Sequence, residues 1–159
     1  MTKAFFNAEE HYEHGIVFYD LMGQKNISLG AFFAAAATGY EPAWNEISEI
    51  IGYKTTDAEQ VERWFRSLES NEALPTMNTY KLGIFLYWYR GNWEEALDYL
   101  LKAAEAQIEY TYQMIGYVYH HGKHDIDKAK EWYEKAASTD HFYHPYSDHY
   151  EELLLSKIR

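Results

Sequence analysis

The sequence predicts an all-α fold, in which four helix–turn–helix repeats stack as a solenoid and a C-terminal helix caps the stack. The chain has 159 residues, and we expect residues 1–159 to form a single helical-repeat domain. Three observations lead to this prediction. An amphipathic pattern occurs twice, small residues recur at a regular spacing, and residues typical of helix starts and turns separate the apolar segments.

The amphipathic pattern appears in residues 94–104 (EEALDYLLKAA) and again in residues 127–137 (DKAKEWYEKAA). Counted from Ala96 and Ala129, apolar residues occupy positions i, i+3, i+4, i+7 and i+8 in both segments. This spacing places them on one face of an α-helix. The interval from Ala96 to Ala129 therefore indicates the length of a repeated unit, which is typical of helical-hairpin arrays.

Small residues mark the first helix of each repeat at a nearly constant spacing: Gly15, Ser48, Gly83 and Gly116. The second-helix pattern begins at the same offset from each of them: Ser28, Val61, Ala96 and Ala129. One alignment therefore fits both halves of each repeat, which predicts four units over about residues 8–40, 41–74, 75–107 and 108–141. A four-helix bundle with additional helices is the alternative all-α fold, but a bundle requires no such period.

Residues at the expected boundaries support these units. Good N-cap residues precede three of the second helices: Asp57, Asn92 and Asp125. Asn92 and Glu95 have the spacing of a capping box. Gly23 and Gly91 occupy equivalent turns, where positive φ is expected, and we assign Gly122 to this role in the fourth unit. The predicted helices span residues 8–22, 27–38, 42–53, 58–70, 77–90, 93–106, 109–121, 126–138 and 145–157, the last being the cap.

The composition restricts the classes of partner. The formal net charge of −11 disfavours nucleic acid and anionic membranes, whereas it would attract a basic protein. The chain has no cysteine, so we expect neither disulfides nor thiolate metal sites. No apolar run approaches the ~18 residues of a membrane span, and the start MTKAFFNAEE is unlike a secretory signal. These features predict a cytoplasmic protein.

The repeat resembles the tetratricopeptide and Sel1-like families of helical hairpins. Their first-helix motif, Leu-Gly-x-x-aromatic, is similar to Leu82-Gly83 with Leu86 and to Ile115-Gly116 with Tyr119. Residues 128–137 (KAKEWYEKAA) resemble the second helix of a Sel1 unit. The similarity covers nearly the whole chain, is strong in the third and fourth units and is fair in the first.

The second unit is the weakest match, because Ser48 and Leu68 replace the usual Gly and Ala there. The resemblance implies a right-handed α-α superhelix whose concave face is lined by the first helices. It also implies close packing of the two helices of a unit at the small residues, and a role in protein binding.

The positions that such arrays direct to the concave face are mostly aromatic in this chain. The predicted partner-binding residues are Tyr12, Tyr19, Tyr53, Tyr80, Tyr87, Trp88, Tyr117 and His121. Tyr and Trp combine a large contact area with few torsions, which suits binding a peptide, helix or loop. We expect about half of these residues to pack between repeats and the rest to be partly exposed.

Two more specific kinds of site are not supported by the residue pattern. Some tetratricopeptide domains hold a terminal carboxylate with Lys, Arg and Asn from successive first helices, but only Lys81 and Asn45 approach that arrangement here. His120, His121 and His124 lie close together in the sequence, yet no HExxH motif accompanies them. We therefore predict no metal site and expect these histidines to lie at a solvated turn and groove.

Enzyme signatures are also missing. The sequence has no GxSxG motif, no phosphate-binding glycine loop and no GxGxxG. The acidic residues Glu9, Glu10, Glu13, Glu94 and Glu95 fit helix starts, where carboxylates complement the helix dipole. We therefore predict a protein without catalytic activity or cofactor.

The predicted function is that of a protein–protein interaction module, acting as a scaffold or a regulatory subunit. The main alternative is an immunity- or antitoxin-type protein that neutralises a basic toxin by occluding it, suggested by the small size, the acidic charge and the aromatic face. A homodimer that buries the tyrosines against a second copy is a further alternative. A metal-binding or enzymatic role has the least support.

Overall fold

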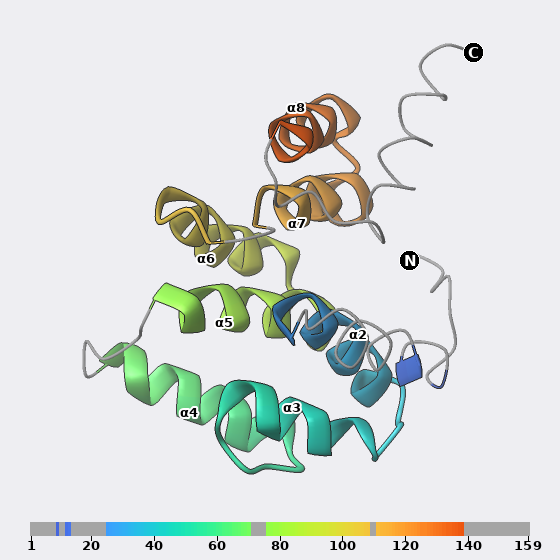
Figure 1. Cartoon of the computed structure of the whole chain (residues 1–159), viewed down its shortest axis with the longest axis vertical. Helices are drawn as coiled ribbons and strands as arrows, with labels where there is room; N and C mark the ends of the chain where they lie inside the picture. The colour runs from blue at the N-terminus through green and yellow to red at the C-terminus, as the bar shows by residue number, and fades with distance from the viewer. Residues whose placement is uncertain (1–8, 10–11, 14–24, 71–75, 109–110, 139–159) are drawn as a thin grey trace.

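The computed structural model describes residues 9, 12–13, 25–70, 76–108 and 111–138, and within these ranges the chain is helical with no strand (Figure 1). The helices are α2 (Lys25–Ala37), α3 (Ala43–Ile51), α4 (Ala58–Ser70), α5 (Thr76–Trp88), α6 (Trp93–Glu105), α7 (Thr111–Val118) and α8 (Ile126–Ala137). A π-helical turn, η2 (Tyr119–Lys123), follows α7. The all-α prediction is confirmed. The predicted capping helix and most of the predicted first helix lie outside the described residues.

The second helices of the later units begin at the predicted N-caps. The Asn92 side chain accepts a hydrogen bond from the Glu95 backbone N–H (3.2 Å), and Asp125 Oδ1 accepts one from the Lys128 N–H (3.1 Å). Each bond satisfies a backbone donor that has no partner inside the helix. The capping box is only half formed by these contacts, because the Glu95 carboxylate pairs with Arg66.

The turn of the fourth unit differs from the prediction. Gly91 has φ +69° as expected, but in the fourth unit the left-handed residue is His124, with φ +59°. His124 follows Gly91 by one repeat length and is its equivalent in the fourth unit. Gly122 has another role, since a Cβ added to it would lie 2.8 Å from Trp93 Cβ. The assignment of Gly122 to the turn was therefore wrong. Gly23 lies outside the described residues.

From α5 to α8, consecutive helices pack against one another: α5 on α6, α6 on α7 and α7 on α8. The small residues allow close approach, as predicted. A Cβ on Gly83 would lie 2.9 Å from Leu100 Cγ, and one on Gly116 would lie 2.6 Å from Tyr133 Cδ1. Leu100 and Tyr133 occupy equivalent positions of their second helices, so the same contact is made twice.

From α2 to α4 the packing follows a different order. Helix α2 contacts α3 and also α5, which is not its neighbour in the chain, whereas α3 and α4 make only sparse backbone contacts. Phe33 packs on Phe85 with ring centroids 5.3 Å apart. Gly30 lets α2 approach α5, since a Cβ there would lie 2.8 Å from Trp88 Nε1.

Ser48, the counterpart of the glycines, explains part of this difference. Its hydroxyl accepts a hydrogen bond from the Thr55 N–H (2.9 Å) and lies 2.8 Å from the Thr55 carbonyl oxygen and 2.7 Å from that of Trp44. It therefore holds the loop after α3, whereas the glycines receive a side chain from the facing helix.

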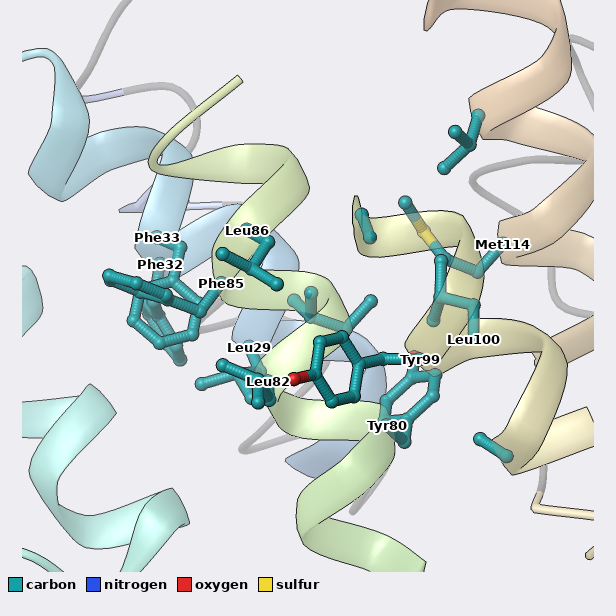
Figure 2. Close-up of a cluster of buried hydrophobic side chains, with 14 of the residues drawn as sticks. Leu29, Phe32, Phe33, Tyr80, Leu82, Phe85, Leu86, Tyr99, Leu100 and Met114 are labelled. Carbon is teal, nitrogen blue, oxygen red and sulfur yellow. The ribbon is translucent and has the colours of Figure 1, made fainter. Parts of the chain in front are cut away.

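One apolar core runs through both regions. Figure 2 shows α2 side chains facing those of α5, and Leu100 of α6 beside Met114 of α7. The labelled core residues are Leu29, Phe32, Phe33, Tyr80, Leu82, Phe85, Leu86, Tyr99, Leu100 and Met114. Burying one such side chain contributes about 1.5–3 kcal/mol. Among the helices that the structure describes, none has both the length and the apolar character needed to cross a membrane.

Candidate functional site

Four of the eight predicted site residues come together where α5 and η2 end. Tyr87 and Trp88 belong to α5, Tyr117 to α7 and His121 to η2. Ring centroids lie 5.2 Å apart for Tyr87 and Trp88, 5.9 Å for Tyr87 and Tyr117, 5.1 Å for Trp88 and Tyr117, and 4.3 Å for Tyr117 and His121. We call these four residues the aromatic row.

These residues lie close to the two glycines at which helices pack closely. Tyr87 and Trp88 lie about one helical turn after Gly83, whereas Tyr117 directly follows Gly116. The row therefore joins the end of α5 to the end of α7. The Tyr87 and Tyr117 rings pack edge to face with an interplanar angle of 87°, a geometry worth about 0.5–1.5 kcal/mol beyond the area buried.

Only part of the aromatic row reaches the surface. Tyr117 and His121 are buried, with exposed fractions of 7% and 9%, while Tyr87 and Trp88 are half-buried. A partner that contacted this row would therefore meet Tyr87 and Trp88, with Tyr117 and His121 supporting them from below.

The other predicted site residues lie elsewhere. Tyr12 packs on Tyr40 (4.9 Å between ring centroids) and donates a hydrogen bond to Glu46 Oε1 (3.1 Å). Tyr53 stacks on Trp64 at 5.0 Å. Tyr80 is buried, and Tyr19 lies outside the described residues. Among the ring contacts of the described residues, none joins Tyr12, Tyr53 or Tyr80 to the aromatic row.

Two further histidines, His120 and His124, follow α7 and lie outside the aromatic row. The rings of His120 and His121 are 4.1 Å apart, and the Tyr133 hydroxyl lies 3.5 Å from His120 Nδ1. His124 is exposed at the turn. Within the part of the chain that the structure describes, no group of three His, Cys, Asp or Glu side chains is arranged to hold a metal ion.

Lys81, one of the two residues considered for a carboxylate clamp, has a contact inside the fold. Its Nζ donates a hydrogen bond to the Ile50 carbonyl oxygen (3.0 Å), near the C-terminal end of α3. Burial lowers the pKa of Lys81. The ammonium therefore satisfies a helix-end carbonyl, while Asn45 is exposed on α3.

Sequence reasoning missed two arginines that connect helices far apart in the chain. Arg66 of α4 pairs with Glu95 and donates to the Tyr99 hydroxyl (2.8 Å) on α6. Burial alone would lower the pKa of Arg66, but the hydrogen bond to Glu95 and the nearby acidic groups raise it. One clue was present in the sequence. Arg66 and Glu95 carry opposite charges and are separated by nearly one predicted repeat length.

The second arginine is Arg90, which follows α5. It donates to Glu59 Oε1 (2.6 Å) and to Glu62 Oε1 (2.9 Å) on α4. These contacts also raise the pKa of Arg90, against the opposing effect of burial.

Comparison with known proteins found no relative of this chain. The chain matches no protein-family model, no curated protein and no solved structure.

Proposed function

We propose that this chain is a non-catalytic helical-repeat module that binds another protein. In this proposal, four helix–turn–helix units form a right-handed solenoid similar to tetratricopeptide and Sel1-like arrays. The repeated glycine contacts of Gly83 and Gly116 support it, because a solenoid is built from one contact used many times. The order of the later units, which meet through α6 and α7, also agrees with it.

The observation that carries the proposed function is the aromatic row, in which buried rings support partly exposed ones. Tyr117, which packs on His121, contacts both Tyr87 and Trp88, so binding would cost these two side chains little further rotamer entropy. Rigid Tyr and Trp side chains are typical anchors of protein interfaces. An anchor of this kind suits a peptide, helix or loop of a partner.

The charge of the chain indicates the character of that partner. A net charge of −11 would speed association with a basic protein, and salt would weaken this effect. The same charge supports the alternative that the chain is an immunity- or antitoxin-type protein occluding a basic toxin. That alternative requires a tight one-to-one complex in which the activity of the toxin is blocked.

The test compares a double variant of the aromatic row with a single-residue control outside it. Tyr87→Ala with Trp88→Ala removes the exposed part of the aromatic row, while Tyr112→Ala removes a half-buried ring that contacts Trp132 instead. We expect affinity capture from the native host to recover a protein with the wild type and with the Tyr112 variant. The double variant should lose it, provided that its urea unfolding shows a folded chain.

Equal capture by the double variant would contradict the assignment of the binding surface. Light scattering separates the homodimer alternative, which predicts a dimer of the wild type that becomes monomeric in the double variant. For the immunity-type alternative, the captured protein should be basic and toxic when expressed alone, and the wild-type chain should block that toxicity at an equimolar ratio.

A further inference from the structure

Within the described part of the chain, helix α4 takes part in several ion pairs with residues outside it. Three such pairs occur among the described residues, Arg66–Glu95, Arg90–Glu59 and Arg90–Glu62, and each has a partner in α4. The remaining described pairs are internal to one helix. Arg66 pairs with Glu62 and Glu69 within α4, and Lys130 pairs with Glu134 within α8.

Helix α4 buries fewer apolar side chains than α6, the helix that Arg66 contacts. Helix α4 buries three side chains, Ala58, Val61 and Phe65, whereas α6 of the same length buries six. In the described part of the chain, the close glycine contacts involve Trp88, Leu100, Tyr133 and Trp93, none of which belongs to α4. Backbone contacts of α4 with α3 are sparse as well.

The two arginines hold the two halves of α4 separately. Arg90 reaches from the turn after α5 to Glu59 and Glu62, in the N-terminal half of α4. Arg66, in the C-terminal half, contacts Glu95 in the first turn of α6 and Tyr99 in the middle of that helix. Figure 1 shows α4 on the side of α5 that faces away from α7 and α8. Helix α4 is therefore attached both through its buried side chains and through these ion pairs, which reinforce a smaller apolar contact than that of α6.

Salt acts differently on these two kinds of contact. The side chains of Arg66, Arg90, Glu62 and Glu95 are 30–37% exposed, so dissolved ions can screen their attraction. Salt does not screen the packing of glycine against an aromatic ring. We propose that α4 is a salt-sensitive flap, which opens from α5 and α6 more often at high ionic strength while α5 to α8 stay folded. This inference does not depend on the identity of any partner.

Native-state hydrogen exchange of the full chain, read by mass spectrometry, tests the proposal without any substitution. Between 50 mM and 1 M NaCl we expect amides of α4 to exchange about tenfold faster, because screening removes most of the attraction of exposed pairs. Amides of α6 and α8 should keep their protection. Salt-independent exchange of α4, or an equal loss of protection in α4, α6 and α8, would overturn the proposal.

Substitution provides a second, independent measurement. Arg66→Met and Arg90→Met keep most of the side-chain length and remove the charge, so the double variant should show fast α4 exchange already at 50 mM NaCl and little further effect of salt. Lys130→Met is the matched control, because it breaks the pair within α8 that joins no two helices. If the double variant kept the salt dependence of the wild type, these ion pairs would not be the cause.

Discussion

The regions α5–α8 and α2–α4 use the same repeat position in opposite ways. In α5 and α7 this position is glycine, and a side chain from the facing helix occupies the space where Cβ would be. In α3 it is Ser48, whose hydroxyl holds the loop at Thr55. The comparison shows that one sequence period can contain two kinds of junction, a packed one and a hydrogen-bonded one.

The difference extends to the neighbouring helices. Where the glycines allow close approach, each helix packs on the next one in the chain from α5 to α8. In the other region, α2 packs on α5, and ion pairs from Arg66 and Arg90 hold α4. Three substitutions and one titration can test this difference.

The largest effect is expected for Gly116→Leu, in the packed region. A Cβ at this position would lie 2.6 Å from a ring carbon of Tyr133, which is itself fully buried. Overpacking of this kind should lower the free energy of unfolding by about 3 kcal/mol, measured by urea denaturation. Tyr133→Ala in the same chain should relieve part of the loss, and strictly additive effects would argue against a direct clash.

Ser48→Ala tests the hydrogen-bonded junction. The substitution leaves the buried Thr55 loop without its partner for the backbone N–H and carbonyl, so the free energy of unfolding should fall by about 1–2 kcal/mol. Ser48→Gly, which restores the repeat consensus, should also destabilise the protein. A stabilising Ser48→Gly would mean that the two junctions do not differ as described.

Tyr99 lies where the two regions meet, on α6 and against Arg66. Burial and a hydrogen bond with Glu69 raise the pKa of Tyr99 to about 12. Because the unfolded phenol titrates near 10, the folded state retains the proton longer, and this contribution is present below pH 10 and lost as the pH rises through 12. The free energy of unfolding should fall by about 1 kcal/mol across that window, and Tyr99→Phe should remove this component.

The smallest effect is expected at the turns. His124 adopts φ +59°, which costs a side-chain-bearing residue more than glycine, so His124→Gly should raise the free energy of unfolding by about 0.5–1 kcal/mol. Gly91→Ala, at the equivalent position with φ +69°, should lower it. Thermal unfolding of the pair measures both changes, and a destabilising His124→Gly would show that the imidazole contributes more than the strain.

Local features were predictable from the sequence alone. For the seven helices that the structure describes, the predicted ends agree with the observed ones to within three residues, and the caps at Asn92 and Asp125 and the close contacts of Gly83 and Gly116 agree with the structure. The left-handed His124 could also have been found, because the repeat period places it over Gly91. The assignment of Gly122 failed because it followed residue type, and here position in the repeat decides the conformation.

The candidate site was predictable only in part. The sequence pattern predicted Tyr87, Trp88, Tyr117 and His121 for one surface, and their rings do meet, but the pattern could not indicate that Tyr117 and His121 are buried. Exposure depends on the angle and distance at which α5 and α7 stack. A rotation of one helix by a fraction of a turn would exchange buried and exposed rings without changing the pattern.

The sequence by itself determined, to within three residues, where the described helices begin and end, and it identified Gly83 and Gly116 as positions of close approach. Caps, turns and hydrophobic periodicity depend on residues within about one or two turns of each other. The tertiary structure alone decided that α2 packs on α5, that Ser48 binds a loop, and that α4 is held by Arg66 and Arg90. These contacts join residues far apart in the chain or depend on how a loop closes, and the geometry of packed helices selects among many pairings that the sequence would equally permit.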